Sequence, residues 1–429
     1  MLVTLFVVFI IMLVLGVPIA FSMGLASTAS LLVGMPTGMI TIPSKIFGGL
    51  DSFSLMAVPF FILAGTLMDV SGVSRKLIRF AEMLVGFVHG GIAMVAVVAS
   101  VIFAGISGSA SADTAAIGAV MIPTMTEKGY EKGFSACLIA AAGTIGPVIP
   151  PSLLMILYSS ATGLSVGTLF MAGILPGLLM AACLLVICYL YARKHPEVDE
   201  SGTGRVGGRE ALHITLEALP AVLMPVIIVG GILTGIFTAT EAAAVACVYA
   251  IAIGVATREL NFKKIWDALA SSAKTSAQLM LIVGVATLLG WILSKEQFPQ
   301  LAADFLVSLT NSKIIITLLI MALLLIVGCF METIAALVIL VPVLYPIGVA
   351  FGFDPVHFAM LIVITLLIGS ITPPVGILLY ISSGMAKIRF TESLKYVTPF
   401  IVALLVSALL VAYIPQITLL VPSLLGYGG

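Results

Sequence analysis

The chain has 429 residues, of which 61% are hydrophobic and 9% are charged, and its mean hydropathy is +1.27. A soluble domain carries about 25% charged residues, so this composition excludes a soluble globule, a disordered chain and a coiled coil. Basic and acidic residues number 19 each, so no net charge attracts nucleic acid, and none is expected as a partner. The five cysteines stand singly in apolar runs, without metal-ligand spacing.

Long runs without charged residues predict helices that span a lipid bilayer. About 20 apolar residues cross a bilayer as a helix, and these runs lack the period-2 alternation of a β-barrel. The N-terminal run has no basic region before it, which predicts a first span rather than a removed signal. An all-α polytopic membrane protein is therefore expected, with nine spans at 3–32, 53–70, 134–160, 168–192, 214–235, 240–257, 275–294, 356–385 and 397–420.

Two of these spans and two further segments have interrupted apolar patterns. The span at 134–160 is broken by Gly-Pro-Val-Ile-Pro-Pro at 146–151, and the span at 356–385 by Thr-Pro-Pro at 372–374. The segments 90–126 and 314–348 have polar centres, GISGSASAD and GCFMET, flanked by short apolar limbs. Each segment predicts a re-entrant hairpin that reaches the middle of the membrane and returns to its own side.

The positive-inside rule supports these hairpins. With both in place, one face carries 16 basic residues and the opposite face only Lys45, Lys295 and Lys313. The basic loops lie at 71–90, 127–133, 193–213, 258–274 and 386–396. This assignment predicts a cytoplasmic N-terminus and a periplasmic C-terminus. The segment 73–88, which has mixed faces, predicts an amphipathic helix at the membrane surface or a simple connector.

The two halves of the chain resemble each other. Asp-Thr at 113–114 matches Glu-Thr at 332–333 in the hairpins, and Pro-Pro at 150–151 matches Pro-Pro at 373–374 in the broken spans. One additional span between the halves turns the second half upside down. The predicted division is a first inverted repeat at 1–192 with a cytoplasmic-entry hairpin, a loop and connector span at 193–239, and a second repeat at 240–429 with an external-entry hairpin.

Inverted repeats with discontinuous helices are the architecture of secondary transporters. The Gly and Ser tips and the prolines free backbone carbonyls at mid-membrane, and with hydroxyls these are ligands that a hard cation such as Na⁺ prefers. Helix N-termini at the tips favour an anion. Four structural alternatives stay open: a helix-packing interface at the first tip, N-terminal helix charges at Asp113 and Glu332, a Thr372 hydroxyl that only satisfies a freed carbonyl, and prolines that only kink the helices, at 147, 150, 151, 373 and 374.

Residues 105–108 also spell GxSG, the nucleophile motif of rhomboid intramembrane proteases. That chemistry needs a base within hydrogen-bond distance of Ser107. The histidines near apolar segments, His89 and His357, are both expected near membrane surfaces. HExxH and a Walker loop are absent from the sequence, so metalloprotease and ATP-driven functions have no support.

Three motifs resemble one known family: GISGSASADTAAIGAVMIPTM at 103–125, GTIGPVIPPS at 143–152 and GSITPPVG at 369–376. Across nearly its whole length, the chain resembles the large membrane subunit of TRAP (tripartite ATP-independent periplasmic) transporters. The overall sequence is most similar to sialic-acid members, although C4-dicarboxylate members share the motifs. The resemblance implies an elevator-type fold of the ion-transporter superfamily in the bacterial inner membrane, not an enzyme. A stand-alone Na⁺-coupled carboxylate symporter of the same superfamily is the alternative function.

The resemblance also implies partners and site residues. The partners are a small membrane subunit on a separate chain and a soluble periplasmic binding protein that delivers an organic acid. The expected acid is sialic acid (N-acetylneuraminate), with C4-dicarboxylate next, and Na⁺ is the coupling ion with no cofactor. The first Na⁺ site is expected at Ser107, Ser109, Gly146, Ile149 and Pro151. The second is expected at Gly328, Cys329, Met331, Thr333, Thr372 and Val375. The substrate is expected at Ser109, Ser111 and Asp113.

Overall fold

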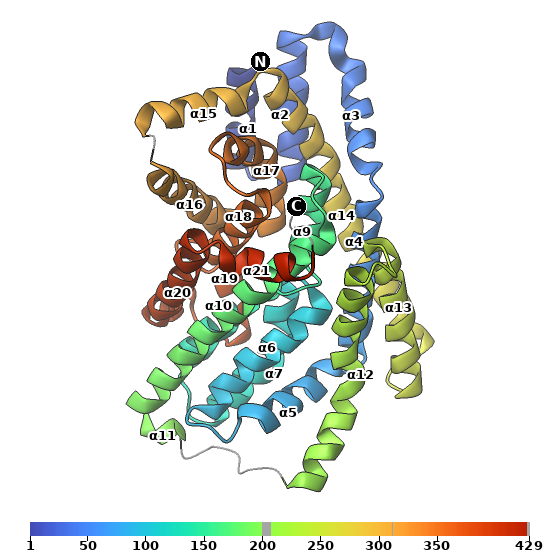
Figure 1. Ribbon diagram of the computed structural model, residues 1–429, viewed down its shortest axis with the longest axis vertical. Coiled ribbons are helices and arrows are strands. Elements are labelled where there is room, and N and C mark those ends of the chain that lie inside the picture. The colour runs from blue at the N-terminus through green and yellow to red at the C-terminus, as the bar shows by residue number, and fades with distance from the viewer. Residues whose placement is uncertain (200–206, 311, 427–429) are drawn as a thin grey trace.

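The computed structural model describes residues 1–199, 207–310 and 312–426, and within these ranges the regular elements are all helical. Figure 1 shows an elongated bundle in which long helices run between two ends of the molecule. Seven helices in the described ranges are long and apolar enough to cross a membrane, and one bent pair makes an eighth. The expectation of an all-α membrane architecture is met, and shorter apolar helices make up the interrupted segments.

The first predicted span is wrong as a single helix. The chain instead forms two helices, α1 (Leu2–Val14) and α2 (Ile19–Gly34), which pack side by side. Gly16 takes a left-handed φ of 76° between them, and the Ser30 hydroxyl donates to the carbonyl oxygen of Met1 at 3.0 Å. The start of α1 therefore lies beside the end of α2. A tight turn at a glycine reverses the chain, which continuous hydropathy does not reveal.

The N-terminus consequently lies at the other end of the molecule from the basic loops. Its amino group is 3.7 Å from Glu296 Oε2, just beyond α14 (Phe262–Lys295). The 34 residues of α14 extend about 50 Å from the basic loop at 258–264 to the opposite end. Placing the N-terminus on the face of the basic loops was thus wrong, because the α1–α2 hairpin returns the chain to its starting side.

The next segment leads into the first hairpin. The 3₁₀ turns η1 (Pro36–Ile40) and η2 (Ser54–Met56) flank α3 (Thr41–Leu50), and α4 (Ala57–Val70) follows. The stretches containing α3 and α4 are bent by 66° and together can form one span. The helix predicted at 73–88 is present as α5 (Val73–Val85), which exposes Arg75 and buries Leu77 and Ala81; its location at the membrane surface stays a prediction.

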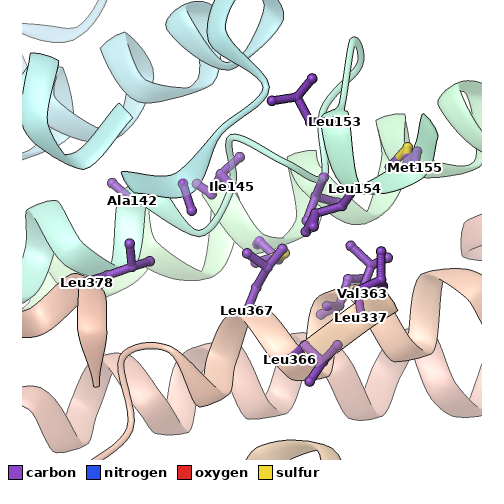
Figure 2. Close-up of a cluster of buried hydrophobic side chains, with 14 of the residues drawn as sticks. Ala142, Ile145, Leu153, Leu154, Met155, Leu337, Val363, Leu366, Leu367 and Leu378 are labelled. Carbon is purple, nitrogen blue, oxygen red and sulfur yellow. The ribbon is translucent and has the colours of Figure 1, made fainter. Parts of the chain in front are cut away.

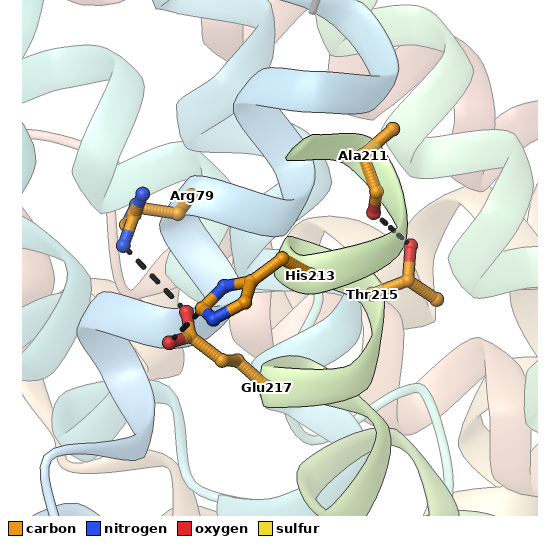
Figure 3. Close-up of polar contacts among 5 residues, drawn as sticks. All are labelled: Arg79, Ala211, His213, Thr215 and Glu217. Atoms are coloured by element: carbon orange, nitrogen blue, oxygen red, sulfur yellow. Dashed lines mark hydrogen bonds and ion pairs between the residues drawn. The ribbon is translucent and has the colours of Figure 1, made fainter. Parts of the chain in front are cut away.

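Helix α5 packs against α12 (Gly208–Leu233), the connector between the two halves. Figure 3 shows the polar contacts at this junction: Glu217 Oε2 lies 3.6 Å from Arg79 Nη1, and Glu217 Oε1 lies 3.5 Å from His213 Nδ1. The Arg79 and Glu217 side chains are 57% and 38% exposed. Such exposed pairs contribute about 0–1 kcal/mol.

Each segment predicted as a hairpin forms two helices joined by a short tip, and its return to the same side of the membrane stays a prediction. The first consists of α6 (Gly91–Ser107) and α7 (Ala110–Glu127), and the second of α16 (Lys313–Phe330) and α17 (Thr333–Ala350). Both broken spans form as well. The first has α8 (Lys132–Gly143) and α9 (Leu153–Thr162) around a break at 144–152. The second has α18 (Pro355–Gly369) and α19 (Ile377–Met385) around a break at 370–376.

The remaining helices complete the two halves, and one corrects a boundary. The predicted span at 397–420 is two helices, because the chain turns at Ile414-Pro415 and proline cannot continue the hydrogen-bond ladder. Part of the predicted loop at 193–213, including Arg205, lies outside the described residues. These helices are α10 (Val166–Lys194), α11 (Pro196–Asp199), α13 (Ala239–Ala256), α15 (Phe298–Leu309), α20 (Phe390–Tyr413) and α21 (Gln416–Leu424).

The order of helix types occurs twice along the chain. The first sequence is α2, the bent α3–α4, surface helix α5, hairpin α6–α7, broken α8–α9 and long α10. The second is α13, α14, short α15, hairpin α16–α17, broken α18–α19 and long α20. Helix α1 stands outside this order, as does the connector α12. The inverted relation between the two halves stays a prediction.

Candidate functional site

The two hairpin tips and the two helix breaks meet at one small pocket. Its volume is about 30 Å³, which is room for only one or two water molecules. It is lined by residues from all four segments: Gly108, Ser109, Ala110 and Ser111 from the first tip; Pro147, Leu153 and Leu154 from the first broken span; Glu332, Thr333 and Ile334 from the second tip; and Leu367, Ser370, Ile377 and Leu378 from the second broken span.

The first tip is a two-residue turn between helices. Gly108 ends α6 with a left-handed φ of 61°, and extended Ser109 begins α7. The backbone N–H of Ser109 donates to Ser107 Oγ at 3.3 Å, and the Ser109 and Ser111 hydroxyls lie 3.3 Å apart. The Ser109 side chain does not cap α7. The hydroxyls of Ser109 and Ser111 therefore gather at a helix N-terminus that lines the pocket.

This tip packs directly on the first break. The backbone N–H of Leu153 donates to the carbonyl oxygen of Gly108 at 3.4 Å. A Cβ on Gly108 would lie 2.5 Å from the carbonyl oxygen of Pro151, so only glycine fits both the left-handed φ and the close approach. The Pro150-Pro151 peptide bond is cis. The first tip and the first break are one contiguous unit.

Asp113 is buried beneath the tip, with an exposed fraction of 1%. Within the described residues, neither carboxylate oxygen has a hydrogen-bond partner. Oδ2 lies against Gly146 in the break, so closely that a Cβ at that position would overlap it. The Thr114 hydroxyl is also buried without a hydrogen-bond partner in these ranges, and it lies against Gly143 in the same manner. Two unsatisfied oxygen groups thus face one turn of the broken span.

The second tip packs on the second break in a similar way. The backbone N–H of Gly376 donates to the carbonyl oxygen of Cys329 at 3.2 Å. A Cβ on Gly328 would lie 2.6 Å from the carbonyl oxygen of Leu366, so the two backbones approach closely at this glycine. The Glu332 side chain accepts a hydrogen bond from the N–H of Ala335 at 3.0 Å, which caps α17.

Each broken span also packs against the hairpin of the other half: α19 contacts α7, and α9 contacts α17. Figure 2 shows the apolar cluster between them, with Leu154 and Met155 of α9 opposite Leu337, Val363 and Leu367. These side chains are fully or nearly fully buried. The two halves are therefore packed closely against each other at this cluster.

Comparison with known proteins agrees with this architecture. The sequence profile of the tripartite ATP-independent periplasmic transporter, DctM component, matches residues 6–417. The chain belongs to this family. DctM is a transporter component, so the chain is a membrane transport protein rather than an enzyme.

Several DctM-family relatives carry names with different substrates. The sialic acid TRAP transporter large permease protein SiaM of Vibrio cholerae is 40% identical over 96% of this chain and 96% of that protein. The C4-dicarboxylate TRAP transporter large permease protein DctM of Pseudomonas aeruginosa is 39% identical over 94% of each chain. The isethionate TRAP transporter permease protein DctMQ of Oleidesulfovibrio alaskensis is 42% identical over 96% of this chain and 65% of that protein.

Solved structures with a similar fold are also transporters. The YdaH transporter of Alcanivorax borkumensis matches with a TM-score of 0.63 at 14% identity, over 88% of both chains. MtrF of Neisseria gonorrhoeae, described among antimetabolite efflux pumps, matches with a TM-score of 0.55 at 14% identity, over 89% of this chain and 85% of that one. At this identity the likeness concerns the fold alone.

The structure brings together some of the predicted site residues of this DctM-family chain and separates others. Ser109, Ser111 and Thr333 line the pocket. Asp113, predicted at the substrate, is absent from the pocket lining and faces Gly146 instead. The sequence analysis did not select Thr114 or Ser370 as site residues. Ser370 is the first residue of the second break, and that position could have indicated it.

Several other predicted residues lie around the two breaks. The Thr372 hydroxyl donates to the carbonyl oxygen of Ile368 at 2.8 Å, as the structural alternative for this residue predicts. Val375 is 41% exposed, and the Met331 side chain is partly buried. Ile149 is half-buried and a Cβ on Gly177 would lie 2.4 Å from its Cγ1. Ile149 lies at the first break and the other three at the second, and none of the four lines the pocket.

The protease alternative lacks its base in the described residues. His357 Nδ1 lies 2.9 Å from Thr418 Oγ1, and its Nε2 lies 3.3 Å from the carbonyl oxygen of Ala412. His89 precedes α6, whereas Ser107 ends that helix, so about 25 Å of helix separates them. No group of three or more His, Cys, Asp or Glu side chains suited to a metal ion occurs in the described ranges.

Proposed function

We propose that this DctM-family chain is the translocating subunit of a Na⁺-coupled importer of organic acids in the bacterial inner membrane. The observation that carries the proposal is the meeting of two hairpin tips and two helix breaks at one pocket. Irregular backbone at membrane depth is tolerated only where it is buried or lines a cavity. Its free carbonyls and N–H groups then serve an ion and a substrate.

The first Na⁺ site is at Asp113. A buried carboxylate without a hydrogen-bond partner is costly unless a cation or a proton compensates it. The Thr114 hydroxyl supplies a second oxygen beside the glycine turn that ends α8, and Ser107 lies near the carboxyl. Gly146, Ile149 and Pro151 of the break supply backbone carbonyls. One carboxylate with neutral oxygens suits a monovalent hard cation.

The second Na⁺ site is at the second tip and break. A hydroxyl that donates its hydrogen keeps lone pairs, so Thr372 can donate to Ile368 and still bind a cation. Gly328 and Cys329 lie where α16 meets the second break. Carbonyl oxygens rather than the Cys329 sulfur are the ligands, because hard cations prefer oxygen. Met331, Thr333 and Val375 complete the predicted set.

The substrate carboxylate binds at the N-terminus of α7, between the Ser109 and Ser111 hydroxyls. A helix N-terminus favours an anion through its free N–H groups and its dipole. The present pocket of about 30 Å³ is far smaller than the several hundred Å³ of usual ligand pockets. The two tips therefore separate to admit an organic acid. Such motion of tips and breaks together is an elevator or gating step.

The substrate and partners follow from the relatives. The relatives are named for acids as different as sialic acid and C4-dicarboxylate. Sialic acid is the first substrate to test. A small membrane subunit on a separate chain is the proposed membrane partner. A soluble periplasmic binding protein delivers the acid.

Reconstituted transport tests this function. The chain is purified with its small subunit, placed in proteoliposomes and supplied with the binding protein and a panel of radiolabelled acids. Uptake of one acid is expected under an inward Na⁺ gradient and only with the binding protein present. Equal uptake in K⁺ medium with a proton gradient would show that Na⁺ is not the coupling ion. Equal uptake without the binding protein would favour the stand-alone symporter.

A further inference from the structure

A second, larger cavity lies away from the pocket at the tips. It has a volume of about 360 Å³ and is enclosed by five helices: α1, α14, α15, α16 and α17. All 17 lining residues are apolar. The rings of Phe6 and Phe298, 5.3 Å apart between centroids, form part of its wall. It therefore lies between the second hairpin and helices of other parts of the chain.

The chemistry of the lining excludes ordered water. A buried water needs two to four polar partners, whereas purely apolar cavities stay dry and bind hydrocarbon. No lining side chain carries a nitrogen, an oxygen or a sulfur. Helices α14, α16 and α17 are long and apolar enough to cross a membrane, so the medium around the cavity is hydrocarbon.

The cavity opens towards that medium. Phe305 of α15 and Leu319 and Leu323 of α16 line it, yet they are 63%, 41% and 44% exposed. These side chains thus form a rim that reaches the outer surface of the bundle. A hydrocarbon chain can enter past them without crossing any polar group.

The volume selects the shape of the occupant. An apolar cavity of about 150 Å³ holds benzene, so by proportion this one holds roughly a dozen carbon atoms. A partner helix is about 10 Å wide with its side chains, and 360 Å³ would contain less than one turn of it. A single acyl chain fits where a protein segment does not.

We propose that this cavity binds one acyl chain of a membrane phospholipid. The acyl chain fills the space between hairpin α16–α17 and the helices α1 and α14. Because the hairpin forms one wall of the cavity, movement of the hairpin changes the shape of the cavity. The flexible acyl chain then adapts to that shape and keeps the space filled. This inference requires the membrane location but does not depend on Na⁺ coupling or on the identity of the acid.

Adjacent alanines on α15 provide a matched pair for the test. Ala302 lines the cavity and Ala303 does not, although both side chains are partly buried. The delipidated full chain in detergent is titrated with palmitoyl-oleoyl phosphatidylethanolamine, and bound lipid is counted by native mass spectrometry. Wild type and Ala303→Trp are expected to bind one lipid at the lowest lipid concentrations of the titration. Ala302→Trp fills the cavity and should need at least tenfold more lipid.

A second pair of variants provides the same test if a variant of the first pair does not fold. Leu323 lines the cavity and Leu318 of the same helix does not, with exposed fractions of 44% and 45%. Leu323→Trp is expected to lose the retained lipid, whereas Leu318→Trp keeps it. Equal lipid retention within the folded pairs, or no retained lipid on wild type, would overturn the proposal. Displacement of the lipid by added small subunit would also overturn it, because the cavity would then be a protein-docking site.

Discussion

The carboxyl of Asp113 lies in contact with Gly146, although the two positions are 33 apart along the chain and the whole of α8 lies between them. A helical hairpin tip is thereby joined to the break of the following span at a buried carboxyl group that has no hydrogen-bond partner within the described residues. A buried carboxylate is costly to remove from water, and a cation bound at this contact, as proposed above, would offset that cost. Such an ion would be part of the packing between tip and break.

Asp113→Asn should remove the part of the stabilisation by Na⁺ that comes from the first proposed site. The amide has the same shape without the charge, so the variant is expected to be as stable as wild type, or more so, without Na⁺. Wild type should gain up to about 2.7 kcal/mol at 100 times the dissociation constant. Thermal unfolding in NaCl and in choline chloride measures this gain. Glu332→Gln, at the matching place of the second hairpin, should keep it. A full Na⁺ effect in Asp113→Asn would contradict the site.

Gly146→Ala should uncouple transport from Na⁺. A Cβ there would overlap the Asp113 carboxyl, so tip and break must move apart and the ligand geometry is lost. Na⁺-driven uptake is expected to fall at least tenfold. Gly384→Ala is the matched control, because a Cβ on that glycine of α19 meets nothing within 4 Å. Similar uptake by the two variants would argue against a role for the contact.

Ser107→Ala and Thr372→Ala should each weaken the Na⁺ dependence of uptake. A lost buried hydroxyl partner costs about 1–3 kcal/mol, which corresponds to about 5- to 150-fold in apparent Na⁺ affinity. Ser100→Ala and Thr365→Ala are the controls. Their hydroxyls donate to Ala96 and Leu361 carbonyls within the same helices, at 2.9 Å and 2.7 Å. If each variant matched its control, the hydroxyls would be structural only.

Gly369→Ala should destabilise the protein itself. Gly369 and Gly328 face each other where α18 meets α16, and a Cβ on Gly369 would lie 2.7 Å from the Cα of Gly328. Overpacking of this kind costs about 1–3 kcal/mol. Gly230→Ala in α12, where a Cβ meets nothing within 4 Å, should be neutral or slightly stabilising. Thermal unfolding of the two variants measures the difference, and equal midpoints would refute the backbone contact.

The two tips should be reached from opposite faces of the membrane. Ala110→Cys and Phe330→Cys, each on a cysteine-free background, are probed with an impermeant thiol reagent. Ala110 lines the pocket with 7% exposure, and Phe330 is 58% exposed at the end of α16. Labelling is expected from the basic-loop face for Ala110 and from the opposite face for Phe330, varying with Na⁺. Labelling of both cysteines from one face only would contradict the inverted arrangement of the two hairpins.

The sequence by itself determined the helical segments and the two interruptions of each half. Absence of charge located the hydrocarbon-spanning stretches, and glycine, serine and proline located the tips and breaks, since these are local backbone effects. The hairpin limbs and the surface helix α5 therefore match their predicted ranges closely. The family motifs lie at the same tips and breaks.

Only the tertiary structure decided which of these segments meet. Hydropathy does not distinguish one long span from two antiparallel helices, so it missed the turn at Gly16 and the resulting position of the N-terminus. The direction of Asp113 towards Gly146, rather than into the pocket, depends on how α7 packs on α8. Such contacts between distant residues arise from packing of whole helices, which no local pattern in the sequence encodes.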